Sequence, residues 1–411
     1  MSPSPRASAP RLPGGPLIAF YGDDYTGSSA VMEVLSFAGL PTVLFLGPPT
    51  PAQLARFQDM RAIGIAGVAR SQPPEWMDAQ LPPIFEQLAR LKAPINHYKV
   101  CSTFDSAPHV GSIGRAAEIG ERLLGGAWHP LIVGAPAIAR YQAFGNLFAG
   151  IDGTGYRLDR HPVMARHPVT PMNEADVRLH LSRQTDMPVG LVDFVAMKTG
   201  RAEQLLAAER AAGARILALD VLDDETLAEA GRLVWEHRGA RLFALGSQGL
   251  EYALVAHWRR AGLLAEEVPT PAPARTERIA VVSGSCSPIT AVQIRHALDH
   301  GFGGVRLDAT RAVDADAWAA EVARGAAAAL NVLEAGQDPL VFTASGPDDP
   351  AVPALGQAIA AAGVAPSQVN ARIGDGLGRV LDELVRRAGL TRAIISGGDT
   401  SGHAGMALGI Y

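Results

Sequence analysis

The chain has 411 residues, of which 48% are hydrophobic and 19% are charged, so it holds enough apolar material for two or three domain cores. Its net charge of −5 at pH 7, with no basic block, argues against nucleic acid as the main partner, because binding to phosphate backbones needs clustered Lys and Arg. The two cysteines, Cys101 and Cys286, lie far apart and have no metal-ligand spacing, which argues against a disulfide framework and favours a cytoplasmic location.

The N-terminal residues and the longest apolar runs bear on targeting. Residues 1–15 lack the apolar run of a secretory signal, and we expect them to form a disordered tail. No apolar stretch reaches the length of about 18 residues that a transmembrane helix needs, so no membrane partner is expected.

Short apolar runs alternate with helix-like segments along the chain. The segment PLIAFYGDDYTGSSAVMEVLSFAGLPTVLFL at 16–46 is expected to form a strand, a turn, a helix and a strand. Similar apolar runs recur as HPLIVGAPAIA, ARILALDV, ARLFALGSQGLEYALVAHW, RIAVVSGSCS, DPLVFTASG and RAIISGGDTSG. Strands that are apolar throughout are typical of parallel sheets covered on both faces. The sequence therefore predicts an α/β protein with two doubly wound domains, mainly parallel sheets and an inter-domain cleft.

One stretch breaks this pattern. The segment LLAEEVPTPAPARTER at 263–278 is rich in proline and charge, as is typical of an extended linker. We predict an N-terminal domain over 16–265, a linker over 266–276 and a C-terminal domain over 277–411.

Two segments of the C-terminal half place glycine and hydroxyl residues between a strand and a helix. They are SGSCSPIT at 283–290 and SGGDTSG at 396–402. Glycine lets the backbone approach a phosphate, and the N-terminus of the next helix offers free N–H groups and a positive dipole. These loops predict a phosphate site that uses Ser285, Ser287, Gly397, Gly398, Asp399 and Thr400. The alternative is that the hydroxyls only cap helices and the glycines only turn the chain.

The segment FYGDDYTGSSA at 20–30 places two adjacent carboxylates after a strand. Asp23 and Asp24 could bind a sugar hydroxyl, or one of them could act as a general base. The alternative is that one caps the helix and the other is solvated.

Two further segments carry polar groups suited to an anionic, polyhydroxylated ligand. The segment at 97–116 contains Lys99, Ser102, Thr103 and Asp105, and the segment at 133–146 contains Arg140 and Tyr141. An arginine could bind a carboxylate or phosphate through two parallel hydrogen bonds. The alternatives are an ordinary polar loop and a surface arginine. The sequence contains no H-E-x-x-H, paired C-x-x-C or G-x-S-x-G motif, which argues against a metallohydrolase and a serine hydrolase, and no metal-ligand residue is named.

Taken together, these motifs resemble the four-carbon acid sugar kinases over residues 16–411. Gly-Asp-Asp-Tyr-Thr-Gly at 22–27 is similar to that family's Ala-Asp-Asp-Phe-Thr-Gly turn, and Lys99 with Ser102 and Thr103 is similar to its Lys-x-x-Ser-Thr element. Other similar segments are VTPMNEADVRLHLSRQT, GSQGL, SGSCSPITAVQI and SGGDTSG. The order and spacing of these segments carry the resemblance.

The resemblance implies an N-terminal sugar-binding domain and a C-terminal nucleotide-binding domain, both α/β. It implies ATP-dependent phosphorylation of a hydroxyl on an acid sugar. Residues implied at ATP are Ser285, Ser287 and 397–400, and residues implied at the sugar are Asp23, Asp24, Lys99, Ser102 and Thr103. Asp399 would order a metal or a water where the family more often has Glu.

Three departures from the family pattern bear on the substrate and the nucleotide site. Ser-Thr-Phe-Asp-Ser at 102–106 stands where the family usually has Ser-Thr-Leu-Arg-Gly, so Asp105 replaces a cation. The usual Gly-Arg-Thr-Thr segment is altered to ARYQAFGN. Both changes resemble the subgroup whose implied substrate is 3-oxo-isoapionate. Family members also usually continue beyond the position of Tyr411 with strands and a Lys-x-Gly loop that would form one wall of the nucleotide site.

The leading hypothesis is therefore a cytoplasmic carbohydrate kinase that uses ATP and Mg²⁺, with Asp24 or Asp23 accepting the proton of the attacking hydroxyl. One alternative is a non-catalytic sensor of an acid sugar or a nucleotide. Another is a nicotinamide-dependent dehydrogenase, against which the lack of G-x-G-x-x-G argues. Alanine-rich helices could support a homodimer.

Overall fold

The computed structural model describes residues 11–151, 153–167, 169–266, 272 and 274–411. The chain forms two compact units, Met1–Thr270 and Pro271–Tyr411. Both are α/β with mainly parallel sheets, as predicted. Most of the predicted linker and of the predicted N-terminal tail lies outside the described residues, and the inter-domain cleft stays a prediction.

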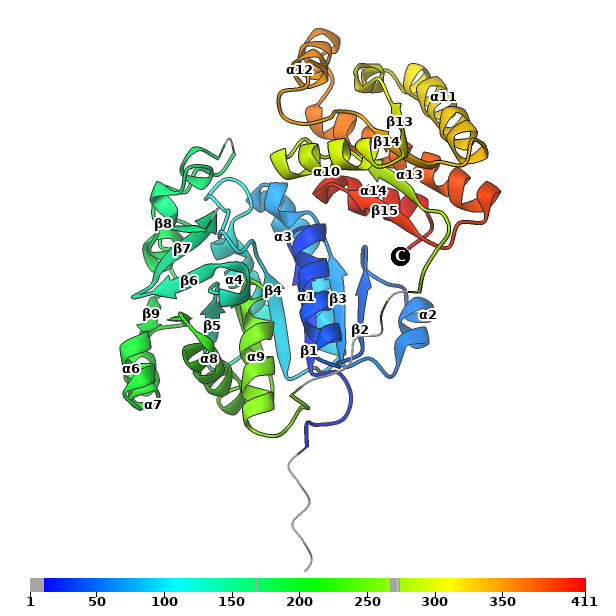
Figure 1. Cartoon of the computed structure of the whole chain (residues 1–411). Helices are drawn as coiled ribbons and strands as arrows, with labels where there is room; N and C mark the ends of the chain where they lie inside the picture. Colours follow the sequence, from blue (N-terminus) through cyan, green and yellow to red (C-terminus); the bar gives the residue numbers. More distant parts are fainter. Residues whose placement is uncertain (1–10, 152, 168, 267–271, 273) are drawn as a thin grey trace, which may run out of the picture. The chain divides into compact units, whose positions relative to one another are not determined.

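An eight-stranded parallel sheet forms the centre of unit 1, in the order β2-β3-β1-β4-β11-β5-β10-β9 (Figure 1). Its strands are β1 (Ile18–Gly22), β2 (Thr42–Phe45), β3 (Ala62–Ala66), β4 (Ile95–Lys99), β5 (His129–Ile132), β9 (Val189–Val192), β10 (Ile216–Leu219) and β11 (Leu242–Gly246).

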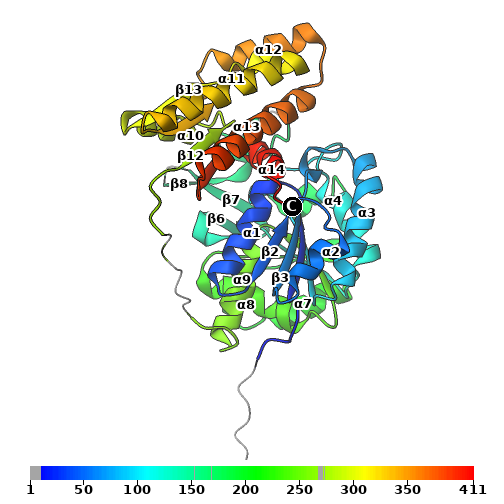
Figure 2. The same ribbon diagram turned by 90° about the vertical axis from the view of Figure 1, so that its right-hand side faces the viewer.

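Helices cover both faces of this sheet. The helices are α1 (Tyr25–Phe37), α2 (Pro51–Leu54), α3 (Pro74–Arg90), α4 (Ile113–Leu123), α5 (Val177–Leu181), α6 (Phe194–Lys198), α7 (Ala202–Ala211), α8 (Asp224–Glu236) and α9 (Gly249–Arg260). Figure 2 shows α1 and α9 on one side of the sheet and α3 and α4 on the other. In β1, Ile18 and Phe20 pack toward α1 and α9, whereas Ala19 and Tyr21 pack toward α3 and α4. Because both faces are buried, the strand is apolar throughout.

A small antiparallel sheet of β6 (Arg140–Ala143), β7 (Asn146–Ile151) and β8 (Thr154–Arg157) is attached to the large sheet, and the sequence did not predict it. The buried Gln142 side chain anchors it, because Gln142 Nε2 donates to Leu219 O at 2.9 Å. Asp220 accepts hydrogen bonds from the backbone N–H groups of Phe144 and Gly145, both of which have positive φ. These contacts fix the β6–β7 turn at the carboxyl end of β10.

Unit 2 contains a four-stranded parallel sheet in the order β13-β14-β12-β15. Its strands are β12 (Ala280–Ser283), β13 (Phe302–Arg306), β14 (Asp338–Phe342) and β15 (Ala393–Ser396), and its helices are α10 (Pro288–Asp299), α11 (Ala315–Glu334), α12 (Ala351–Ala362), α13 (Pro366–Ala388) and α14 (Gly398–Ala407). Helix α10 packs on one face through Ile294, and α11 and α13 pack on the other through Trp318 and Leu377. Strand β12 is followed by α10 on one face, and β14 is followed by α12, which packs on the other face through Leu355 and Ile359. Open α/β sheets bind ligands beyond the carboxyl ends of two such neighbouring strands.

Helix α14 packs tightly against α13 because α13 carries glycine at both points of closest contact. A Cβ atom on Gly374 would lie 2.7 Å from the Cβ of His403, and one on Gly378 would lie 2.6 Å from the Cα of Ala404. This close packing fixes where α14 begins, beside the end of β12. Within the described residues, we find no helix with the length and apolar character needed to span a bilayer.

Candidate active site

Arg70 holds the two carboxylates that follow β1. Its Nη2 lies 2.6 Å from Asp23 Oδ1 and 2.7 Å from Asp24 Oδ1, and its Nε lies 3.2 Å from Asp23 Oδ2. Asp23 is buried, and burial raises its pKa while the charge of Arg70 opposes that shift. Asp24 stays partly exposed and caps α1, because its Oδ1 accepts the N–H of Gly27 at 2.9 Å. Asp24 Oδ1 is therefore engaged twice, and no hydrogen bond from a described residue reaches Oδ2.

Lys99 ends β4 beside these carboxylates. It is buried and pairs in register with Gly22 of β1, and its Nζ donates to Val100 O at 2.6 Å. A Cβ atom on Gly27 would lie 2.3 Å from both Asp24 Oδ1 and Lys99 Nζ. A side chain at residue 27 would therefore displace the charged ends of both groups. We call Asp23, Asp24, Arg70 and Lys99 the acid–base cluster.

The loop after β4 brings together most of the predicted sugar-binding residues. Thr103 Oγ1 donates to Asp105 Oδ1 at 2.8 Å, and both residues are buried. Phe104 between them is buried at φ 60°, a left-handed conformation that is costly for a bulky residue and that packing must maintain. Ser102 is partly exposed and has no hydrogen-bond partner among the described residues.

Arg140, at the start of β6, has side-chain N–H donors that lack acceptors among the described residues. Its Nη1 donates to the carbonyl oxygens of Ile138, Ala139 and Gly150, at 3.1, 3.2 and 3.3 Å. Its Nε is buried, and neither Nε nor Nη2 has a partner among the described residues. Burial lowers the pKa of Arg140, and the nearby Cys101 and Asp105 oppose that shift, so Arg140 lies near the 101–105 loop.

Tyr141 does not share this position. Because side chains alternate along a strand, Tyr141 points to the face of β6 opposite that of Arg140 and Gln142. The structure therefore brings Arg140, but not Tyr141, toward the loop that carries Thr103 and Asp105.

In unit 2, the two predicted phosphate loops meet at one side chain. A Cβ atom on Gly284 would lie 2.2 Å from Thr400 Oγ1, and one on Gly397 would lie 2.9 Å from the same oxygen. The Cβ of Gly397 would also lie 3.3 Å from the backbone N of Ser285. A side chain at either glycine would therefore crowd Thr400, and the two loops approach each other closely there.

The N-terminus of α14 lies at this junction. Gly397, with φ 122°, occupies the N-cap position, and no side chain caps the helix there. The backbone N–H groups of Gly398 and Thr400 lack partners among the described residues. Free first-turn N–H groups and the helix dipole are suited to an anion. The side chain of Asp399 lies outside the described part of the structure.

The serines of the other loop have local partners. Ser287 is the N-cap of α10 and accepts the N–H of Thr290 at 3.1 Å. The hydroxyls of Ser285 and Ser287 each lie 2.9 Å from Thr290 Oγ1. The capping alternative therefore describes Ser287; Ser287 is exposed and Ser285 is partly exposed.

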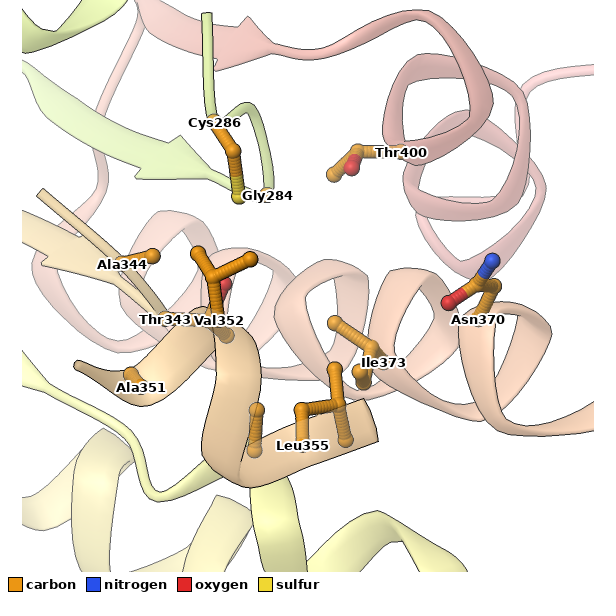
Figure 3. A pocket seen from close by; sticks show the side chains of 11 residues that line it. Gly284, Cys286, Thr343, Ala344, Ala351, Val352, Leu355, Asn370, Ile373 and Thr400 are labelled. Carbon is orange, nitrogen blue, oxygen red and sulfur yellow. The ribbon is translucent and has the colours of Figure 1, made fainter. Parts of the chain in front are cut away.

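A hollow of about 200 Å³ opens beside these loops (Figure 3). It is lined by Gly284, Cys286, Ala309, Thr343, Ala344, Ala351, Val352, Leu355, Asn370, Ile373 and Thr400. Asp349 stabilises the rim of the hollow, because it forms an ion pair with Arg306 and accepts hydrogen bonds from the N–H groups of Ser345 and Ala351. The hydrogen bond from Arg306 holds the pKa of Asp349 well below its usual range, so the Asp349 carboxylate stays ionised at neutral pH.

Arg70 and the apolar residues that α12 and α13 contribute to the hollow were not predicted from the sequence. Arg70 follows β3 by four residues in GVAR, so its position after an apolar run was a usable signal. The wall residues Val352, Leu355 and Ile373 carry no such signal, because only helix packing brings them to the hollow. Among the described residues, no group of three or more His, Cys, Asp or Glu side chains is arranged to hold a metal ion.

Two family models match the chain. A sugar-binding N-terminal domain model matches residues 18–254, and a nucleotide-binding C-terminal domain model matches residues 280–411. These ranges correspond to units 1 and 2.

Named relatives and solved structures agree with this match. The chain is 50% identical to a 3-oxo-isoapionate kinase of Paraburkholderia graminis, over 99% of this chain and 87% of the relative. It is 31% identical to a 3-oxo-tetronate kinase of Methylobacterium radiotolerans, over 94% of this chain and 87% of that protein. A crystal structure of a Haemophilus influenzae protein is similar with a TM-score of 0.69 and 25% identity, over 95% of this chain and 88% of that one. The chain therefore belongs to the four-carbon acid sugar kinase family.

Proposed function

We propose that the protein transfers the γ-phosphoryl group of ATP to a hydroxyl of 3-oxo-isoapionate or a closely similar branched oxo acid sugar. The observation that carries the phosphotransferase assignment is the meeting of two glycine loops at Thr400, beside the uncapped N-terminus of α14. The substrate rests on the 50% identity to a 3-oxo-isoapionate kinase and on Asp105, which departs from the wider family. No observation favours the non-catalytic alternative.

Unit 2 supplies the nucleotide site in this proposal. The free N–H groups of Gly398 and Thr400 receive phosphate oxygens, and the hydroxyls of Ser285 and Ser287 add donors without adding charge. When bound, Mg²⁺ would neutralise charge on the phosphates. It needs only one or two protein carboxylates besides phosphate and water, which fits a site that carries Asp399 in the first turn of α14.

Unit 1 supplies the acceptor site. Asp24 is the better candidate for the base, because its Oδ2 is unengaged and the residue is partly exposed, whereas both oxygens of the buried Asp23 bind Arg70. Asp24 accepts the proton of the attacking hydroxyl as the oxygen–phosphorus bond forms and ADP leaves. A strong base is not needed, because phosphoryl transfer depends mainly on positioning and charge stabilisation.

The carboxylate of the sugar pairs with Arg140. The backbone carbonyls occupy Nη1 and Nε is buried, which leaves Nη2 as the charged donor for a carboxylate. The carboxylates of Asp105 and Asp24 then accept sugar hydroxyls, with Lys99 balancing their charge.

Initial rates of ADP release with a panel of acceptors test the proposal. We expect rapid release with 3-oxo-isoapionate, slower release with 3-oxo-tetronate and almost none without an acceptor. Tight binding of ATP and sugar without acceptor-dependent ADP release would instead support a sensor.

A further inference from the structure

The hollow in unit 2 has two chemically different sides (Figure 3). Gly284 and Thr400 of the phosphate loops lie on one side, and Val352, Leu355 and Ile373 form the other. A nucleotide has the same division, because its phosphates are anionic and its base presents a flat apolar face. The loops therefore fix which end of the nucleotide enters the apolar side.

Asn370 stands at the edge of the apolar side. It lies one helical turn before Ile373 on α13, so both residues face the same hollow. The Asn370 side chain is exposed and has no hydrogen-bond partner among the described residues. Among the residues that line the hollow, only Asn370 offers an amide donor and a carbonyl acceptor side by side in one plane.

We propose that Asn370 binds the edge of the adenine base and is a specificity-determining residue for the nucleotide. A carboxamide can accept from the adenine N6 amino group and donate to the adjacent ring nitrogen. The apolar side chains of Val352, Leu355 and Ile373 then contact the face of the ring. This inference rests on the proposed function of unit 2 as the ATP site.

An aspartate at residue 370 provides a sharp test. A carboxylate cannot donate to the ring nitrogen of adenine, but it can accept from both N1–H and the 2-amino group of guanine. Asn370→Asp should therefore shift the preference from adenine toward guanine nucleotides. Repulsion between the new charge and the phosphates acts on both nucleotides alike and cancels in their ratio.

Gln368→Glu is the matched control. Gln368 is exposed, lies two residues earlier on α13 and does not line the hollow, and the substitution makes the same change from amide to acid. Asn370→Ala serves as a second variant that removes the contact without adding charge. Both positions changed are exposed surface positions of one helix, so near-equal melting temperatures of the three variants will verify that folding is intact.

The experiment measures the dissociation constants of fluorescent ADP and GDP analogues on the full chain, together with kcat/KM for ATP and GTP. We expect Asn370→Asp to lower the ADP-to-GDP affinity ratio about tenfold, Asn370→Ala to weaken ADP about tenfold, and Gln368→Glu to leave the ratio unchanged. Equal ratios in wild type and Asn370→Asp would overturn the inference. Nucleotide binding without sugar-dependent turnover would refute the proposed kinase activity. The ADP-to-GDP affinity ratio would still test whether Asn370 binds the base. Binding of neither nucleotide would overturn both.

Discussion

Arg70 Nη2 lies 2.6 Å from Asp23 Oδ1, and Asp23 is almost completely buried. This pair places a carboxylate and a guanidinium at the carboxyl ends of β1 and β3, next to Lys99. It uses both oxygens of Asp23 and leaves Asp24 as the carboxylate with an unengaged oxygen. The two adjacent acids thus have different surroundings, which the sequence could not distinguish.

Arg70→Leu should destabilise the protein, because it leaves Asp23 buried without its cation. We expect a fall of about 3 kcal/mol in the free energy of unfolding, measured by urea titration. Asp23→Asn on its own should also be costly, but the double variant should be more stable than the sum of the two single effects predicts. Strict additivity would contradict a direct Arg70–Asp23 interaction.

Asp24→Asn should lower the rate of catalysis without changing the stability of the fold. Asparagine is as good an N-cap as aspartate, so α1 should keep its cap, while the group that accepts the hydroxyl proton is lost. We expect kcat to fall about 10²- to 10⁴-fold with an unchanged dissociation constant for ATP, from steady-state kinetics and equilibrium binding. Unchanged turnover in this variant would eliminate Asp24 as the base, and the matching Asp23→Asn variant shows whether its neighbour acts instead.

Gly284→Ala should damage the nucleotide site selectively. The added Cβ would lie 2.2 Å from Thr400 Oγ1, so the Thr400 side chain or the loop that carries it must shift. We expect ATP affinity to fall at least about tenfold by calorimetry, since phosphate contacts through several N–H groups depend on this geometry.

Gly356→Ala on α12 is the control for this substitution, because nothing lies within 4 Å of the added Cβ. The second variant Thr400→Ala removes the clashing oxygen, and combining it with Gly284→Ala should recover part of the lost affinity. Full ATP affinity in Gly284→Ala alone would show that the loops need not meet at Thr400.

His180 should make the stability of unit 1 depend on pH. Burial, with a smaller effect of Arg183, lowers its pKa to about 4, so the folded state holds the neutral ring. The unfolded chain binds the proton at a pKa of about 6.5, so stability is lost as pH falls from about 6.5 to about 4. The loss from this residue is up to about 3 kcal/mol.

His180→Gln tests this dependence, because glutamine keeps a donor for Ser106 Oγ, which lies 2.9 Å from His180 Nε2, and does not titrate. The difference in unfolding free energy between pH 7 and pH 4 should be smaller in the variant than in wild type, measured by urea titration at each pH. The same difference in both proteins would contradict a buried neutral His180.

The sequence predicted the strands best, because the apolar runs of β1, β11, β12 and β14 are buried on both faces. It also located the glycine loops, since turns after strands need glycine whatever the surrounding fold. It did not predict the small antiparallel sheet, whose residues 140–157 mix glycine, aromatic and charged side chains without a clear alternation.

The roles of residues that depend on tertiary contacts could not be predicted from the sequence. Asp24 and Ser287 have the residue types of both helix caps and ligand contacts, and only the structure shows that they cap α1 and α10. In the sequence, Asn370 cannot be told apart from other polar residues of a helix, because only the structure shows the hollow beside α13. Arg70 acquires its importance only because β3 and β1 are neighbours in the sheet.

The most direct test of the proposed kinase activity is phosphorus NMR of the full chain incubated with ATP, Mg²⁺ and 3-oxo-isoapionate. We expect a new phosphate-ester signal that grows in equal amount with ADP, is absent without the sugar, and grows much more slowly with Asp24→Asn. ADP with inorganic phosphate alone, or no consumption of ATP despite binding of both ligands, would contradict phosphoryl transfer to this acid sugar.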